Sequence, residues 1–102
     1  MMTKKLAVQD YPGDHIKIRI DDQDLDFVKA KEIAKQQAKE LCDEPMLLSW
    51  YQGSTGESYP NLECGRGDMP AWILYAASRG ANMTVDINNG QYIFIYLCVS
   101  QE

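Results

Sequence analysis

The sequence predicts an α+β domain with elements in the order β-α-β-α-β-β. A four-stranded mixed sheet carries one long helix packed on one face and a short second helix. This prediction rests on apolar residues that recur with a period of two over residues 15–20 and 82–99, and with a helical period over residues 25–42. Because the chain has 102 residues, we expect a single domain at 15–102, preceded by a flexible lead-in at 1–14.

The first half of the chain predicts a β-α-β unit. In the first strand, isoleucines alternate with polar and charged residues, which is typical of a half-buried strand. Asp22 or Asp24 is expected to cap the long helix, and Pro45 is expected to end it. A second strand follows at residues 46–51. The two strands are expected to run parallel, either as neighbours or with another strand between them.

A long connection separates the two halves of the chain. Residues 52–69 exceed the usual length of a loop in a compact domain, and such loops are usually functional or partly disordered. A short helix is then predicted at residues 70–79, with Pro70 in its first turn and Gly80 as its stop.

The C-terminal part predicts a β-hairpin around the Asn-Asn-Gly sequence at residues 88–90. A two-residue turn would pair Ile87 with Tyr92, so that aliphatic and aromatic side chains share a face. A three-residue loop would pair Ile87 with Gln91 and gather the aliphatic side chains toward the long helix. We favour the three-residue loop because it segregates the aliphatic residues.

That register leaves an aromatic face on the last strand. Tyr92, Phe94 and Tyr96 would then need cover from the short helix, the long loop or a second subunit. We therefore predict these three residues as an interface and expect self-association, through this face or through a strand edge.

Composition excludes several functions. The net charge of −5 does not favour nucleic-acid binding, and no apolar run reaches the ~20 residues of a membrane span. The N-terminus has no secretory pattern, so we expect a cytoplasmic protein. The three cysteines are accordingly interpreted as free thiols.

The strongest candidate site is the loop Cys64-Gly65-Arg66-Gly67 with Glu63 before it. Glycines on both sides of Arg66 allow a tight turn that points backbone N–H groups at an anion. The helix start that follows would lower the pKa of the Cys64 thiol. The alternative is that Cys64 is a small buried residue that anchors the loop.

A second candidate is the end of the long helix, where Cys42 and Asp43 are predicted as ligand-binding residues. Asp43 lies where the helix dipole disfavours negative charge, although it also suits a simple backbone cap. The ligand spacings of known metal sites are absent from the sequence, and His15 is the only histidine. We therefore expect no metal, no cofactor and no enzymatic activity.

Three segments together resemble a known family: LCDEPMLLSWY at residues 41–51, PNLECG at 60–65 with Trp72, and TVDI at 84–87. They are similar to a small uncharacterised prokaryotic family, a domain of unknown function, over roughly residues 15–97. The resemblance implies no activity. The sequence predicts a non-enzymatic binding or protein-interaction module with an unknown protein or small-anion partner. The alternative is thiol chemistry or anion binding at the Cys64 loop.

Overall fold

We describe residues 13–60 and 70–98 of the computed structural model. The elements are β1 (Asp14–Ile18), α1 (Phe27–Leu41), β2 (Pro45–Gln52), β3 (Ser58–Tyr59), α2 (Ala71–Ser78), β4 (Met83–Ile87) and β5 (Tyr92–Cys98). The α+β class and the predicted order of the main elements are confirmed. The sheet has five strands instead of four, because the short strand β3 pairs with β2 inside the region predicted as a connection.

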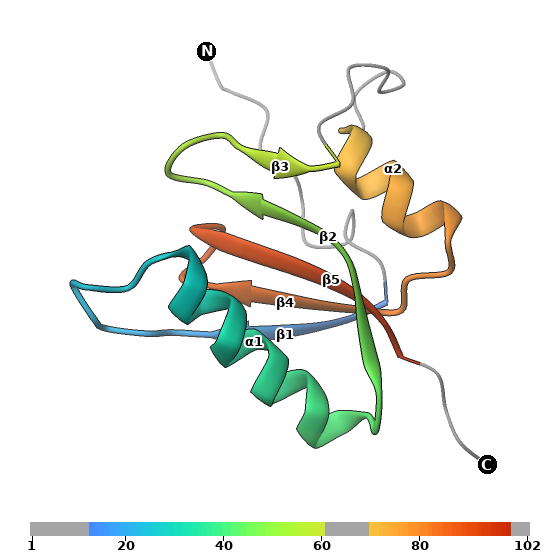
Figure 1. The fold of residues 1–102 in the computed structure, drawn as a ribbon, viewed down its shortest axis with the longest axis horizontal. Coiled ribbons are helices and arrows are strands. Elements are labelled where there is room, and N and C mark those ends of the chain that lie inside the picture. Colours follow the sequence, from blue (N-terminus) through green and yellow to red (C-terminus); the bar gives the residue numbers. More distant parts are fainter. Residues whose placement is uncertain (1–12, 61–69, 99–102) are drawn as a thin grey trace.

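The strands lie in the order β1-β4-β5-β2-β3, as Figure 1 shows. β1 and β4 are parallel, and every other neighbouring pair is antiparallel. β1 and β2 therefore point the same way, as predicted. However, the whole β4–β5 hairpin lies between them, and its two strands are the most completely buried of the sheet.

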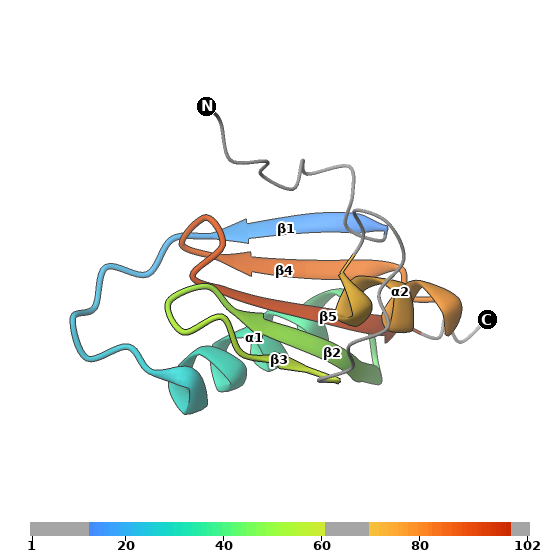
Figure 2. The same ribbon diagram turned by 90° about the horizontal axis from the view of Figure 1, so that it is seen from above.

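The two helices cover opposite faces of the sheet (Figure 2). α1 packs on one set of alternating residues of β4 and β5, together with Ile16 and Ile18 of β1. α2 places Trp72, Ile73 and Ala76 on the other face, against β5 and β2. His15 and Lys17 alternate with the two isoleucines, so they belong to the α2 side of the sheet.

α1 begins two residues later than predicted. Its N-cap is Asp26, and not Asp22 or Asp24, because the Asp26 carboxylate accepts a hydrogen bond from the backbone N–H of Lys29 at 2.9 Å. Asp22 instead accepts the backbone N–H of Asp24 in a turn before the helix. The buried face of α1 consists of alanines four residues apart: Ala30, Ala34 and Ala38.

The favoured hairpin register is wrong, and the alternative is observed. Ile87 pairs with Tyr92, which leaves Asn89 and Gly90 at the centre of a two-residue turn. Asn88, Asn89 and Gly90 all have positive φ, 56°, 54° and 100°, and positive φ at the two central residues matches the twist of the flanking strands. The backbone preference of the turn therefore determines the register, and not the segregation of aliphatic residues.

The predicted interface is wrong for the same reason. Tyr92, Phe94 and Tyr96 share a face with Met83, Val85 and Ile87 and lie beneath α1, with exposures of 5%, 0% and 2%. The alanines of α1 explain this cover, since small helix residues leave room for large rings on the sheet. The aromatic face is a core within one chain.

Candidate ligand-binding pocket

An open pocket of ≈ 480 Å³ lies where β1 ends and the β4–β5 turn begins. β1 and β4 form the parallel pair of the sheet, and both end here. Ligands of open α/β sheets bind in crevices at the carboxyl ends of such strands. The pocket is lined by Lys17, Ile18, Arg19, Ile20, Asp21, Asn88, Asn89 and Gln91.

The Asn88 side chain holds the two walls of this pocket together. Its Oδ1 accepts the N–H of Ile20 at 2.8 Å, and its Nδ2 donates to the carbonyl of Ile20 at 3.0 Å. The same Nδ2 donates to Oε1 of Gln91 at 2.7 Å. The side-chain amide thus takes the place of a backbone peptide and extends the pairing between β1 and β4 by one unit.

The turn is braced from two further directions. The buried carboxylate of Asp86 accepts the N–H of Gly90 at 2.7 Å, and the N–H of Gly53 donates to the carbonyl of Gln91 at 2.8 Å. A side chain at Gly53 would overlap the carbonyl of Gly90, so glycine is needed at this approach. The pocket wall is therefore fixed before any ligand binds.

Positive and negative groups both line the pocket. Lys17 and Arg19 are exposed. Lys17 belongs to the alternating set of β1 that points away from α1, and Arg19 follows directly after the strand. Asp21 follows at the rim, and Asp86 is the register partner of Lys17 on β4. The arrangement offers two cations and several amide groups to a small polar molecule, with one exposed carboxylate beside them.

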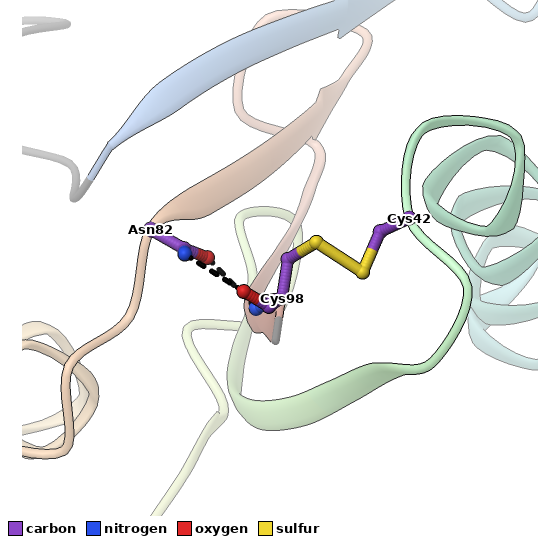
Figure 3. Close-up of a disulfide and its surroundings, with 3 residues drawn as sticks. All are labelled: Cys42, Asn82 and Cys98. Carbon is purple, nitrogen blue, oxygen red and sulfur yellow. Dashed lines mark hydrogen bonds between the residues drawn. A yellow bond between two sulfur atoms is a disulfide. The ribbon is translucent and has the colours of Figure 1, made fainter. Parts of the chain in front are cut away.

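The opposite end of β4 carries a second asparagine clamp, shown in Figure 3. Nδ2 of Asn82 donates to the carbonyl of Cys98 at 3.0 Å, and Oδ1 accepts the N–H of Cys98 at 2.8 Å. At this end a disulfide also joins Cys98 to Cys42, the C-cap of α1, with their Cα atoms 6.0 Å apart.

The disulfide corrects two predictions about Cys42. The cysteine is not a free thiol, and it is not available as a ligand-binding thiol while the bond is closed. The odd number of cysteines and the expected cytoplasmic location had indicated free thiols. In the fold, the end of α1 returns to the end of the last strand, at a distance that a disulfide spans.

Asp43, the other predicted ligand-binding residue that the structure describes, does not line the pocket. Asp43 is exposed beside Cys42, at the far end of the hairpin from the pocket. Glu63, Cys64, Gly65, Arg66 and Gly67 lie outside the described residues, so the Cys64 site stays a prediction.

Sequence reasoning missed the pocket residues. Lys17 and Arg19 were assigned to the polar face of a strand, and Asn88 to the turn alone. A usable signal was present, since Asn82 and Asn88 flank the alternating strand pattern at residues 83–87. Asparagine at a strand end can bond to neighbouring backbone through its own amide.

Within residues 13–60 and 70–98, three or more His, Cys, Asp or Glu side chains do not gather in any arrangement that would hold a metal ion. Among the same residues, neither helix is long and apolar enough to cross a membrane.

Fold and pocket together define a small α+β protein with an open mixed sheet and a polar pocket at the ends of its parallel strands. The chain belongs to the family described as Domain of unknown function (DUF5619), whose model matches residues 13–96. The resemblance inferred from the sequence is thereby confirmed.

A similar protein and a similar solved structure both come from Archaeoglobus fulgidus. An uncharacterised protein is 32% identical over 81 residues, which cover 79% of this chain and 85% of that protein. The crystal structure of the protein AF1514 has a TM-score of 0.76 and 29% identity, and it covers 88% of this chain and 99% of that chain. The fold is therefore shared across most of both chains.

Proposed function

We propose that this protein is a non-enzymatic binding module whose pocket holds a small polar ligand through an acidic group of that ligand. The observation that carries the proposal is the braced pocket at the ends of β1 and β4, with Lys17 and Arg19 on its wall. Arg19 offers a planar fork of donors that matches a carboxylate or phosphate, and Lys17 adds a compact charge.

The fixed backbone supports binding, because a preformed site loses little conformational entropy when a ligand enters. Asn88 and Gly53 hold the turn in position without the ligand. Asn89 and Gln91 bring amide groups to the same space, and Asp21 is placed to accept a hydrogen bond from a hydroxyl or amine of the ligand. A small acid that also carries such a donor fits this set of groups.

The chemistry of the lining favours binding over catalysis. Among the residues that line the pocket, cysteine, serine and histidine are absent, and Lys17 and Asp21 lie on an open, solvated rim. Nucleophilic catalysis needs an activated nucleophile beside a base, and general acid–base catalysis works best with a group that titrates near neutral pH. This lining supplies charge and hydrogen bonds.

The test is a titration of ¹⁵N-labelled protein with inorganic phosphate, acetate, malonate or serine, each added separately. Binding is monitored through the amide chemical shifts. We expect saturable shifts confined to residues 17–21 and 88–91. Arg19→Ala and Lys17→Ala should each weaken binding about tenfold, which corresponds to one lost charged contact. Lys35→Ala, on the exposed face of α1, is the matched control and should bind as the wild type does.

If Lys35→Ala weakened binding as much as Arg19→Ala, the binding would reflect general charge attraction, and the proposal would be wrong. The same holds if all four compounds leave residues 17–21 unshifted up to the highest soluble concentration.

Two earlier predictions remain open beside this proposal. Self-association would now have to use a strand edge, since β1 ends the sheet among the described residues and the aromatic face is buried. Light scattering tests it directly. A cytoplasmic location also stays a prediction, and the disulfide weakens its support because such bonds persist mainly in oxidising compartments.

A further inference from the structure

α1 is attached to the sheet unequally along its length. At its N-terminal end, Phe27 packs against the rings of Trp50 and Phe94, with centroid distances of 4.6 and 5.6 Å. Toward the C-terminal end, the buried side chains are alanines, which bury little apolar area each. Cys42 continues their four-residue spacing and ends it with the covalent bond to Cys98. The second half of α1 therefore depends on this bond.

The sheet does not depend on the bond in the same way. Both backbone groups of Cys98 are held by the Asn82 side chain, and the N–H of Asn82 donates to the carbonyl of Tyr96. β5 also pairs with β4 on one side and β2 on the other. Opening the disulfide removes a support from α1 and leaves the hydrogen bonds of β5 in place.

We propose that Cys42–Cys98 is a site of reversible reduction by a dithiol, and that reduction releases the C-terminal half of α1 while the sheet stays folded. A released helix end uncovers Met83 and Tyr96, which share a core cluster with Cys42. The redox state of the bond then decides whether the end of α1 covers this part of the apolar core.

The exchange balances as follows. A thiolate of the dithiol attacks Sγ of Cys98, because Cys98 is half-buried and therefore more accessible than Cys42, which is 8% exposed. The Sγ–Sγ bond breaks, and Cys42 leaves as a thiolate and takes a proton. The second thiol of the reagent then attacks the reagent sulfur that is bonded to Cys98. That bond breaks, and Cys98 is released as a thiol. Two electrons and two protons pass to the protein, and the dithiol becomes a cyclic disulfide.

A dithiol is the expected reagent because of where Cys42 lies. Cys42 is buried, and its Cα lies 6.0 Å from that of Cys98, so it stays within reach of Cys98 after the first exchange. A monothiol that reached Cys98 would be displaced again when Cys42 returned to the mixed disulfide. A second thiol in the reagent removes the mixed disulfide before that return.

The experiment is ¹⁵N relaxation of the native protein before and after treatment with dithiothreitol, in a Cys64→Ser background that removes the third thiol. On reduction, the order parameters of residues 35–41 should fall from about 0.85 toward about 0.6, while those of residues 92–97 stay near 0.85. Mass spectrometry after alkylation confirms that both cysteines were reduced. Air oxidation should restore the original values.

Three results would overturn the proposal: a bond that dithiothreitol opens only after denaturation, an equal loss of order in α1 and β5, or unchanged order in α1 after complete reduction. Cys42→Ala with Cys98→Ser keeps a small residue in the alanine series without the bond. This double variant should match the reduced protein and ignore dithiothreitol. A double variant as rigid as the oxidised protein would also contradict the proposal.

Discussion

At each end of β4 an asparagine side chain bonds to both backbone groups of a residue from a neighbouring segment of the chain. Asn82 holds Cys98 of β5, and Asn88 holds Ile20 beyond the end of β1, with nearly identical distances. The first end is also closed by a disulfide, whereas the second is closed by hydrogen bonds alone and borders the pocket. The same asparagine clamp therefore occurs at an end that a disulfide also holds and at an end that borders an open pocket.

The two ends of β4 are held in different ways. A covalent link restricts the unfolded chain and needs no favourable contact in the fold, while a side-chain clamp acts only in the folded state. An end closed by hydrogen bonds can leave polar groups facing solvent, as Lys17 and Arg19 do. We therefore expect stability to concentrate at the Cys98 end and ligand binding at the Ile20 end.

The largest effect should come from removing the disulfide. Cys42→Ala with Cys98→Ser releases a cross-link between residues 56 apart, which should lower the free energy of unfolding by about 4 kcal/mol. Urea unfolding of the oxidised wild type and the double variant measures this loss. A difference below about 1 kcal/mol would show that the bond adds little beyond the Asn82 clamp, given the stabilisation of 2–4 kcal/mol that is typical of disulfides.

The two clamps can be compared directly by matched substitutions. Asn88→Asp keeps the acceptor for the Ile20 N–H but loses the two donated hydrogen bonds and places a carboxylate near two oxygens. We expect a loss of about 2–3 kcal/mol in unfolding free energy, since these groups are half-buried.

Asn82→Asp in oxidised protein should cost about 1 kcal/mol, because the disulfide still holds Cys98 near its place. After reduction, the same substitution should cost more. Denaturation of both variants with and without reductant gives all four values. Equal costs for Asn82→Asp in the two redox states would contradict the idea that bond and clamp support the same end.

A smaller effect is expected where β2 approaches the pocket turn. Gly53→Ala places a Cβ against the carbonyl of Gly90 and should cost about 1–3 kcal/mol through displaced backbone. It should also shift the amide resonances of residues 88–91.

Gly56→Ala is the control, since Gly56 has positive φ but open space around it. It should cost about 1–2 kcal/mol from backbone strain alone. The pocket resonances should then stay unchanged. Pocket shifts in both variants would show that the turn responds to general destabilisation and not to this contact.

Local patterns in the sequence were sufficient to predict the two helices and four of the strands, because alternation and helical period are visible in consecutive residues. The two-residue strand β3 is too short to show such a pattern. The register of the hairpin was misjudged because two preferences competed, and the positive-φ geometry of Asn89 and Gly90 outweighed the sorting of side chains. From that error followed the mistaken interface at Tyr92, Phe94 and Tyr96, whose cover depends on α1.

The pocket and the disulfide were beyond local reasoning for a different reason. Asn88 meets Ile20 across 68 residues, and Cys42 meets Cys98 across 56. Such contacts depend on strand order, and the position of the β4–β5 hairpin between β1 and β2 could not be chosen from the pattern alone. Once that order is known, both contacts follow from residues that end an element.

The smallest effect concerns Tyr96, which reports on the core beneath the disulfide end. Burial, and then the charge of Glu32, raise the pKa of the Tyr96 hydroxyl above its ordinary value of 10.0. The unfolded chain therefore loses this proton first as pH rises. The stability that Tyr96 contributes is fully present below pH 10 and declines above it, toward the raised pKa of the folded protein.

Tyr96→Phe isolates this contribution, since phenylalanine keeps the ring and cannot ionise. Between pH 7 and roughly pH 10, unfolding free energies of wild type and variant should run parallel; above that, the wild type should fall more steeply. Parallel curves throughout would mean that the Tyr96 hydroxyl ionises equally well in both states. In reduced protein, a released α1 would let water reach the ring, so the divergence should shrink. An unchanged divergence after reduction would mean that the cover of Tyr96 does not depend on the disulfide.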